Sequence, residues 1–153
     1  RIAERERDTM QQIALFTENL LGASTGMTPI ANRGRDLKLV EIIDQASATV
    51  GPEFQSRPAV EAGLQATLGG SYMALGLYDK ARPHVERAAA LALPLHGEAH
   101  PLSARVLKLR GRLHMAAGDF DAAANDLAAG LKASPDPFTH GYLGEARWRQ
   151  SRL

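Results

Sequence analysis

Residues 73–81 read MALGLYDKA, and residues 115–123 read MAAGDFDAA. The two stretches share five identities and one aromatic match in nine positions, at an offset of 42 residues. Farther upstream at the same offset, Gly69 pairs with Gly111. Similarity at a fixed period is the sequence signature of repeat proteins, in which copies of one unit stack on each other. We therefore expect at least two copies of one structural unit in this chain.

Each copy has the pattern of two antiparallel helices joined by a tight turn. An apolar helical pattern leads to Gly76 in the first copy and to Gly118 in the second, and glycine favours the left-handed conformation that follows many helices. Asp79 and Asp121 stand shortly afterwards, behind an aromatic residue, and suit the N-cap of a second helix. The expected helices cover residues 57–75, 79–93, 101–117 and 121–133.

Small residues occur where the two helices of each hairpin must approach closely, because a larger side chain there would push the helices apart. Pro101 suits a helix start, where its missing N–H costs nothing, and Pro135 follows the end of the last of these helices. The small residues are Gly69, Ala81, Ala88, Gly111 and Ala123.

The composition favours an all-α fold. Of 153 residues, 44% are hydrophobic and 23% are charged, close to the globular average, and abundant alanine raises the helix propensity. The absence of cysteine excludes disulfides and thiolate chemistry. The formal net charge of +1 provides no general attraction to nucleic acid, and no apolar run is long enough to span a membrane.

These features resemble the tetratricopeptide repeat, and the 42-residue offset together with the segment Leu95–Pro101 is similar to the kinesin-light-chain-like variant of that repeat. The resemblance implies antiparallel helical hairpins stacked as a short right-handed superhelix, with the two repeats at residues 52–100 and 101–135. The matching residues are Leu68, Gly69, Tyr72, Gly76, Tyr78, Ala81 and Ala88 in the first copy, and Leu107, Gly111, Gly118, Phe120, Ala123, Leu127 and Pro135 in the second.

Residues 1–51 are expected to form an irregular leading pair of helices, separated by a loop at residues 22–36 that is long for a compact helical array. Residues 136–153 are expected to form a partial third repeat or a capping helix. The apolar stripe of the first leading helix is Met10, Ile13, Phe16, Leu20 and Leu21, and that of the second is Leu39, Val40, Ile43, Ala46 and Val50.

The leading segment also carries a second resemblance. A charged helix, a loop and then the stretch 37–46 (LKLVEIIDQA) resemble the region before the repeats in bacterial serine/threonine kinases. This implies a piece of a larger bacterial signalling protein, either cytoplasmic or extracytoplasmic, in which any membrane anchor lies outside this chain. The alternative parent is a winged-helix transcriptional regulator that carries such repeats as its effector part.

The first helix of each hairpin is expected to line a partner-binding groove. Arg105, Lys108 and Arg112 lie at i, i+3 and i+7, which places three cations on one helix face where they could bind an acidic segment. The alternative interpretation is a solvated charged face. The expected groove residues are Gly63, Ala66, Gly70 and Met73 in the first copy, and Arg105, Lys108, Arg112 and Met115 in the second.

The search for catalytic and metal-binding patterns gives a weak result. His96 and His100 flank Glu98, but no third ligand stands at a supporting spacing, and the other histidines lack a serine or carboxylate partner. We therefore expect a non-enzymatic scaffold without metal or cofactor, which binds a protein or peptide of acidic character and no nucleic acid. The alternative is a structural module that self-associates as a homodimer, and the loop 22–36 is a second candidate binding region.

Overall fold

The computed structural model describes residues 4, 5, 7, 8, 10–12, 15 and 32–152. Within these residues all regular structure is helical, which confirms the expected all-α fold, and the described residues between 4 and 15 are helical as well. The helices are α2 (Asn32–Phe54), α3 (Pro58–Ala74), α4 (Tyr78–His96), α5 (Pro101–Ala117), α6 (Phe120–Ala133) and α7 (Pro137–Gln150).

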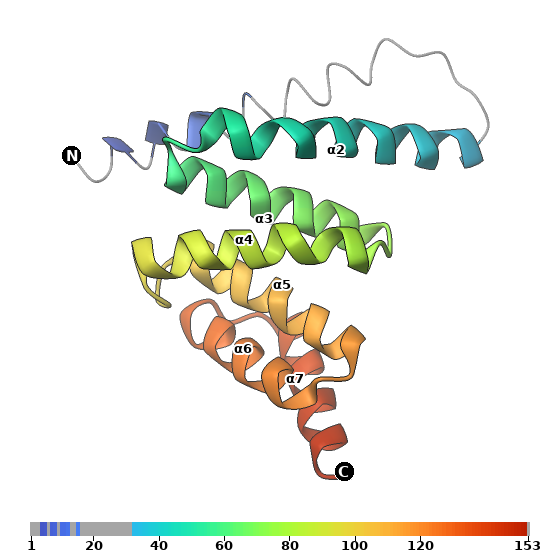
Figure 1. Ribbon diagram of the computed structural model, residues 1–153. Coiled ribbons are helices and arrows are strands. Elements are labelled where there is room, and N and C mark those ends of the chain that lie inside the picture. The colour runs from blue at the N-terminus through green and yellow to red at the C-terminus, as the bar shows by residue number, and fades with distance from the viewer. Residues whose placement is uncertain (1–3, 6, 9, 13–14, 16–31, 153) are drawn as a thin grey trace.

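The helices follow one another from α2 at one end of the molecule to α7 at the other (Figure 1). Helices α3 and α4 form one antiparallel hairpin, and α5 and α6 form the next. Helix α3 also contacts α5, and α5 contacts α7, whereas the backbones of α4 and α6, both fully described, stay more than 8 Å apart between Cα atoms. The first helices of successive hairpins therefore lie together in one layer, which we call the inner layer (α3, α5 and α7).

Each hairpin closes over a glycine, as the sequence predicts. A Cβ atom added to Gly69 would lie 2.6 Å from Cγ2 of Val85 on α4, and one added to Gly111 would lie 2.7 Å from Cγ of Leu127 on α6. Both distances are shorter than a normal van der Waals contact. The glycines therefore allow the two helices of each hairpin to approach closely.

The turns within the hairpins also agree with the sequence, except for the residue that caps the second helix. Gly76 and Gly118 have φ angles of 73° and 78°, the left-handed conformation that glycine adopts without strain. One expected N-cap, Asp79, lies in the first turn of α4, and the other, Asp121, lies in the first turn of α6. Asp119 caps this helix, because its side chain accepts a hydrogen bond of 3.1 Å from the backbone N–H of Ala122.

The leading region differs more from the expectation. Helix α2 begins at Asn32, inside the segment 22–36 that the sequence predicts as a loop. Residues 32–36 read NRGRD and carry no apolar stripe that could reveal a helix. The remainder of the predicted loop, together with Ile13, Phe16, Leu20 and Leu21 of the expected first stripe, lies outside the described residues.

The apolar core is divided among three clusters that connect each hairpin to its neighbours. On α2 the predicted stripe is buried at Ile43, Ala46 and Val50, whereas Leu39 is 44% exposed. The first cluster joins α2, α3, α4 and α5 around Leu64, Tyr72, Val85 and Leu113. The second joins α3, α4 and α5 around Ala66, Ala88 and Val106, and the third joins α6 and α7 around Leu127, Leu131, Leu143 and Ala146.

A polar network attaches α2 to the first hairpin. Asp44 on α2 accepts hydrogen bonds from the hydroxyl of Tyr72 at 2.6 Å and from Nζ of Lys80 at 2.7 Å. These partners lower the pKa of Asp44, the hydrogen bond from Lys80 contributing most. Burial, together with the bond to Asp44, raises the pKa of Tyr72 to about 12. The network thus holds one carboxylate and one phenol in their normal charge states at neutral pH.

His84 of α4 forms the second half of this network. Its Nδ1 lies 2.6 Å from Oε1 of Gln65 and its Nε2 lies 2.9 Å from the hydroxyl of Ser47, while its ring stacks on Tyr72 at 5.4 Å between centroids. Because the amide oxygen only accepts hydrogen bonds, Nδ1 carries the proton, and in the neutral ring Nε2 accepts from Ser47. Burial lowers the pKa of His84 below its ordinary value of 6.5.

This histidine predicts a pH dependence of stability. Unfolded His84 takes up a proton near pH 6.5, whereas folded His84 resists it, so stability is complete above that pH and decreases as the pH falls below it. The decrease is at most about 1.4 kcal/mol per pH unit. Urea unfolding at pH 7.5 and at pH 5.5 measures the difference in the free energy of unfolding between the two pH values. This difference should be smaller in the His84→Gln variant than in wild type. In His140→Gln, the control at an exposed site, it should equal that of wild type. An equal difference in all three proteins would contradict this assignment.

Candidate functional site

The accessible side of the inner layer is the main candidate surface. It consists of small side chains on α3, two arginines on α5 and two aromatic rings on α7, and we call it the inner face. Its residues are Thr67, Gly70, Ser71 and Ala74 of α3, Arg105, Leu109, Arg112 and Ala116 of α5, and Phe138 and Tyr142 of α7.

Helix geometry divides the eight predicted groove residues into two sets. Positions three residues apart on a helix differ in direction by about 60°, so Gly63 and Gly70 do not face the same way as Ala66 and Met73. In the structure, Gly70, Arg105 and Arg112 lie on the inner face, whereas Gly63 is buried. The structure therefore places three members of the set Gly63, Gly70, Arg105 and Arg112 on an accessible surface.

The other set packs between hairpins. Ala66 is fully buried beside Val106, and Met73 is 3% exposed within the cluster that joins α2, α3, α4 and α5. Met115 is partly buried against the cluster of α6 and α7. On the first helix of each hairpin, these positions face the neighbouring hairpin of the stack. Met73 is therefore committed to packing, whereas Met115 remains partly accessible.

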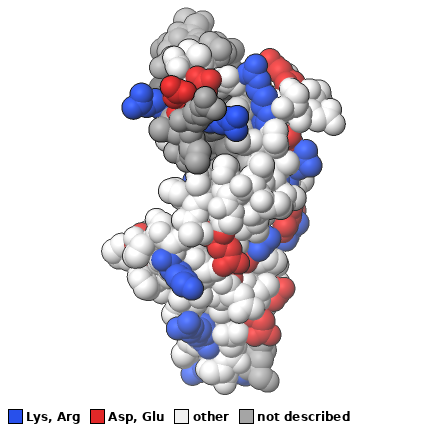
Figure 2. Space-filling model, turned by 90° about the vertical axis from the view of Figure 1, so that its left-hand side faces the viewer, with Lys and Arg blue, Asp and Glu red and all other residues white. Residues whose placement is uncertain are grey.

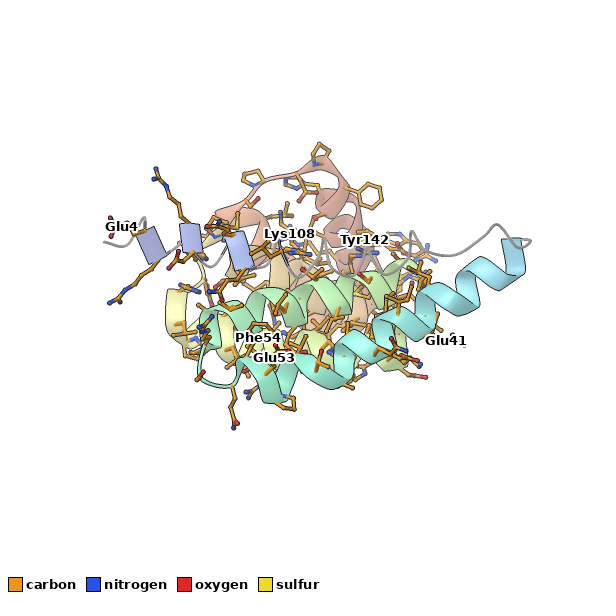
Figure 3. All side chains as sticks on the ribbon, turned by 90° about the horizontal axis from the view of Figure 1, so that it is seen from above. Glu4, Glu41, Glu53, Phe54, Lys108 and Tyr142 are labelled. Carbon is orange, nitrogen blue, oxygen red and sulfur yellow. The ribbon has the colours of Figure 1, made fainter. Side chains whose placement is uncertain are left out.

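Lys108 is also committed to the fold. Its Nζ lies 2.6 Å from Oδ2 of Asp136 and also donates to the carbonyl of Ser134, so it ties α5 to the start of α7. This bond holds the pKa of Asp136 well below its ordinary value. Viewed from above, Lys108 lies on the same side of the molecule as Tyr142 and away from Glu53 of α2 (Figure 3). Of the three predicted groove cations, this one already has a carboxylate partner.

Arg105 and Arg112 differ from Lys108 in their surroundings. Arg105 is exposed and lies beside Gly70: a Cβ added to that glycine would be 3.9 Å from Nη2 of Arg105. Although the side chain reaches the surface, neighbouring protein atoms partly desolvate the guanidinium and so lower the pKa of Arg105. The guanidinium carbon of Arg112 lies 5.5 Å from the centroid of the Tyr142 ring, a cation–π contact between α5 and α7.

Sequence reasoning did not find the aromatic part of this face. Phe138 is 74% exposed, and its ring meets that of Tyr142 edge to face at 5.7 Å between centroids. The i, i+4 spacing of the two rings on α7 was the available signal, because it places both on one side of the helix. Thr67, Ala74, Leu109 and Ala116 were detectable too, since each stands four residues after one of the predicted groove residues.

A shallow depression adjoins the inner face. It has a volume of about 570 Å³ between the α3–α4 turn and the end of α5. Its charged residues are of mixed sign, and Lys80 within it is bound to Asp44. The lining residues are Gly76, Leu77, Tyr78, Asp79, Lys80, Arg82, Ala116 and Ala117.

The histidines at the repeat junction have structural contacts. The rings of His96 and His100 stack at 4.1 Å between centroids, and Nδ1 of His100 accepts the backbone N–H of Leu102 at 3.2 Å, which caps α5. Across the described residues, no three side chains of metal-ligating type converge on one point. None of the helices described for this chain has both the length and the hydropathy of a membrane span.

Comparison with known proteins gives one match. Residues 61–136 match the family model of the tetratricopeptide repeat, whereas no curated protein and no solved structure matches the chain. The matched residues extend from the first turn of α3 to the residue before α7, so they include both hairpins described above. The repeat in the sequence, the two glycine-closed hairpins and this match agree: residues 61–136 form a tetratricopeptide repeat domain.

Proposed function

We propose that this chain is a protein-interaction scaffold and that its inner face holds a segment of another polypeptide. Tetratricopeptide repeats are interaction modules without catalytic groups of their own. We choose this surface because of the small side chains on the α3 side of the inner face. Thr67, Gly70, Ser71 and Ala74 offer no bulky side chain over two helical turns. A polypeptide backbone can therefore approach α3 closely.

The proposed context is the regulatory or sensing part of a larger bacterial signalling protein, such as a serine/threonine kinase. Its support is the resemblance of the leading segment and residues 37–46 to the region before the repeats in those kinases. The winged-helix regulator is the second candidate parent. The nucleotide sequence upstream of the codon for Arg1 tests this directly: an encoded kinase domain supports the first context, and a winged helix supports the second.

A blocked inner face tests the binding proposal. A Cβ added to Gly70 would lie 3.9 Å from Nη2 of Arg105 and from Cδ2 of Leu109, which is ordinary contact distance, so we expect Gly70→Trp to fold and to cover the α3 side. Gly144→Trp is the matched control, because that glycine is exposed on α7 with nothing within 4 Å of an added Cβ. Peptides selected from a random dodecapeptide display library against wild type should bind the control equally and bind Gly70→Trp at least about tenfold more weakly, a loss of 1.4 kcal/mol.

The outcome decides between this proposal and its alternatives. Selected peptides that bind Gly70→Trp as well as wild type would exclude the inner face as the binding surface. A library that yields no binding peptide, together with a molar mass that rises with protein concentration in light scattering, would favour the self-associating module instead.

A further inference from the structure

Helix α2 has few connections to the helices that follow it (Figure 1). Among helices α3–α7, its backbone approaches only α3 to within 8 Å between Cα atoms. It reaches α4 through two side-chain links, from Asp44 to Lys80 and from Ser47 to His84. Residues 55–57 form a turn between α2 and α3, so the two helices are separate. Helix α2 can therefore move about this turn while both hairpins keep their own contacts.

The nitrogen of His84 that can take up a proton faces α2. Nδ1 lies 2.6 Å from the amide oxygen of Gln65 on α3 and carries the ring proton. Nε2 is therefore the atom that titrates, and the hydroxyl of Ser47 on α2 lies 2.9 Å from it. Burial of the ring lowers the pKa of His84. Moving α2 away would expose Nε2 to water, so proton uptake and the opening of α2 are thermodynamically linked.

The charged groups on the α2 side of His84 do not compensate a proton on its ring. Asp44 is already bound to Nζ of Lys80 at 2.7 Å and to the hydroxyl of Tyr72 at 2.6 Å, and Glu41 is exposed to solvent. Tyr72 remains neutral, because burial and its bond to Asp44 raise its pKa to about 12. Nζ of Lys80 also lies 5.8 Å from the centroid of the Tyr72 ring, on which His84 stacks. Protonated His84 would thus be a second cation against one ring.

The carboxylate on the α3 side is matched as well. Glu61 stands one helical turn before Gln65, and Arg87 of α4 donates to both of its carboxylate oxygens, while Glu86 of α4 is exposed. Acidic and basic side chains are interspersed on the face shown in Figure 2, so no concentrated acidic field there would stabilise another cation. The closed structure therefore favours neutral His84, whereas an opened structure lets water hydrate the charged ring.

We propose that α2 is an acid-released cover of the first hairpin, and that uptake of a proton by His84 opens α2 while the two hairpins stay folded. This goes beyond the proposed function, because it concerns the attachment of α2 and not the inner face. The opened state exposes Ile43, Ala46 and Val50 together with the part of the first hairpin that they bury. The linkage acts below the ordinary histidine pKa of about 6.5 and disappears above it, since an exposed ring is then neutral as well.

Single introduced cysteines measure the opening, because the chain contains no cysteine of its own. Ala46→Cys places a thiol on the buried face of α2, where Ala46 is 4% exposed, and Ala123→Cys places one in the fully buried core of the second hairpin. Labelling with 4,4′-dithiodipyridine, normalised to the same protein unfolded in urea at the same pH, gives the opening constant at each site. At pH 7.5 and at pH 5.5, this constant should be at least about tenfold larger for Ala46→Cys than for Ala123→Cys, because α2 opens without the hairpins.

The pH response tests the role of His84. From pH 7.5 to pH 5.5 the opening constant of Ala46→Cys should rise by up to about tenfold, the factor that corresponds to one pH unit below the ordinary histidine pKa. Adding His84→Gln should abolish this rise, because glutamine does not titrate but can still form hydrogen bonds with Ser47 and Gln65. Adding His140→Gln, the control at an exposed site, should leave the rise unchanged.

Hydrogen exchange followed by mass spectrometry checks the result in wild type, without any substitution. Relative to their intrinsic exchange rates, peptides from residues 39–54 should lose protection at pH 5.5, and peptides from residues 120–133 should keep the higher protection at both pH values. Equal opening constants at the two cysteines would show that α2 opens only when the whole protein unfolds, and would overturn the proposal. A rise in acid that persists with His84→Gln would place the titration at another group and overturn it as well.

Discussion

Replacing Gly111 by leucine should lower the free energy of unfolding by about 3 kcal/mol. A Cβ at this position would lie 2.7 Å from Cγ and 2.9 Å from Cδ2 of Leu127, and 3.3 Å from the carbonyl oxygen of Ala123. Leu127 is fully buried, so we expect α5 and α6 to separate in order to accommodate the added atoms. Urea unfolding followed by circular dichroism measures the loss.

Gly144 provides the matched control for this prediction. It is also a helical glycine, but it is exposed, and nothing lies within 4 Å of an added Cβ. Gly144→Leu should therefore raise stability by up to about 1 kcal/mol, since leucine has the higher helix propensity. A loss at Gly111 no larger than the change at Gly144 would show that the hairpin does not depend on close helix approach.

The second large effect is expected at an ion pair between α3 and α4 in which the carboxylate is buried. Glu61 is only 2% exposed by its side chain, and Arg87, whose side chain is 48% exposed, donates from Nε to Oε1 at 2.8 Å and from Nη2 to Oε2 at 3.2 Å. Arg87→Leu should destabilise the protein by about 3 kcal/mol, because it leaves a buried carboxylate without its partner. Thermal and urea unfolding at pH 7 measure the change.

A double variant separates the lost pair from lost packing. Adding Glu61→Gln to Arg87→Leu removes the unpaired charge, so more than half of the lost stability should return. Arg149→Leu breaks a surface pair with Glu145 in which both side chains are nearly half exposed, and it should cost less than about 1 kcal/mol. If the double variant is no more stable than Arg87→Leu, the cost lies in packing and not in the buried charge.

The fold was predictable over residues 57–133 because its signals are local. Helix starts and stops, the left-handed glycines and the close-packing glycines act within a few residues of each other, and the 42-residue repeat shows each signal twice. Residues 32–36 were not predictable as helix, because they lack an apolar stripe and the stability of that helix comes from packing of its later residues. The joining of α2 to α4 through Asp44 and His84 was equally invisible, since each partner is far away in the sequence.

The candidate site was predictable only in part, for a geometric reason. From the sequence alone, the inner layer could be assigned to the first helix of each hairpin, and Arg105, Lys108 and Arg112 could be placed on one side of α5. The tertiary structure alone decided which of them has a carboxylate partner within the described residues. Lys108 meets Asp136, which is 28 residues away, and Arg112 meets the ring of Tyr142, while Arg105 lies beside Gly70 of α3. Local sequence determines whether a helix forms and which residues share a side. The packing of neighbouring helices determines which of those residues are neutralised and which remain available to a partner.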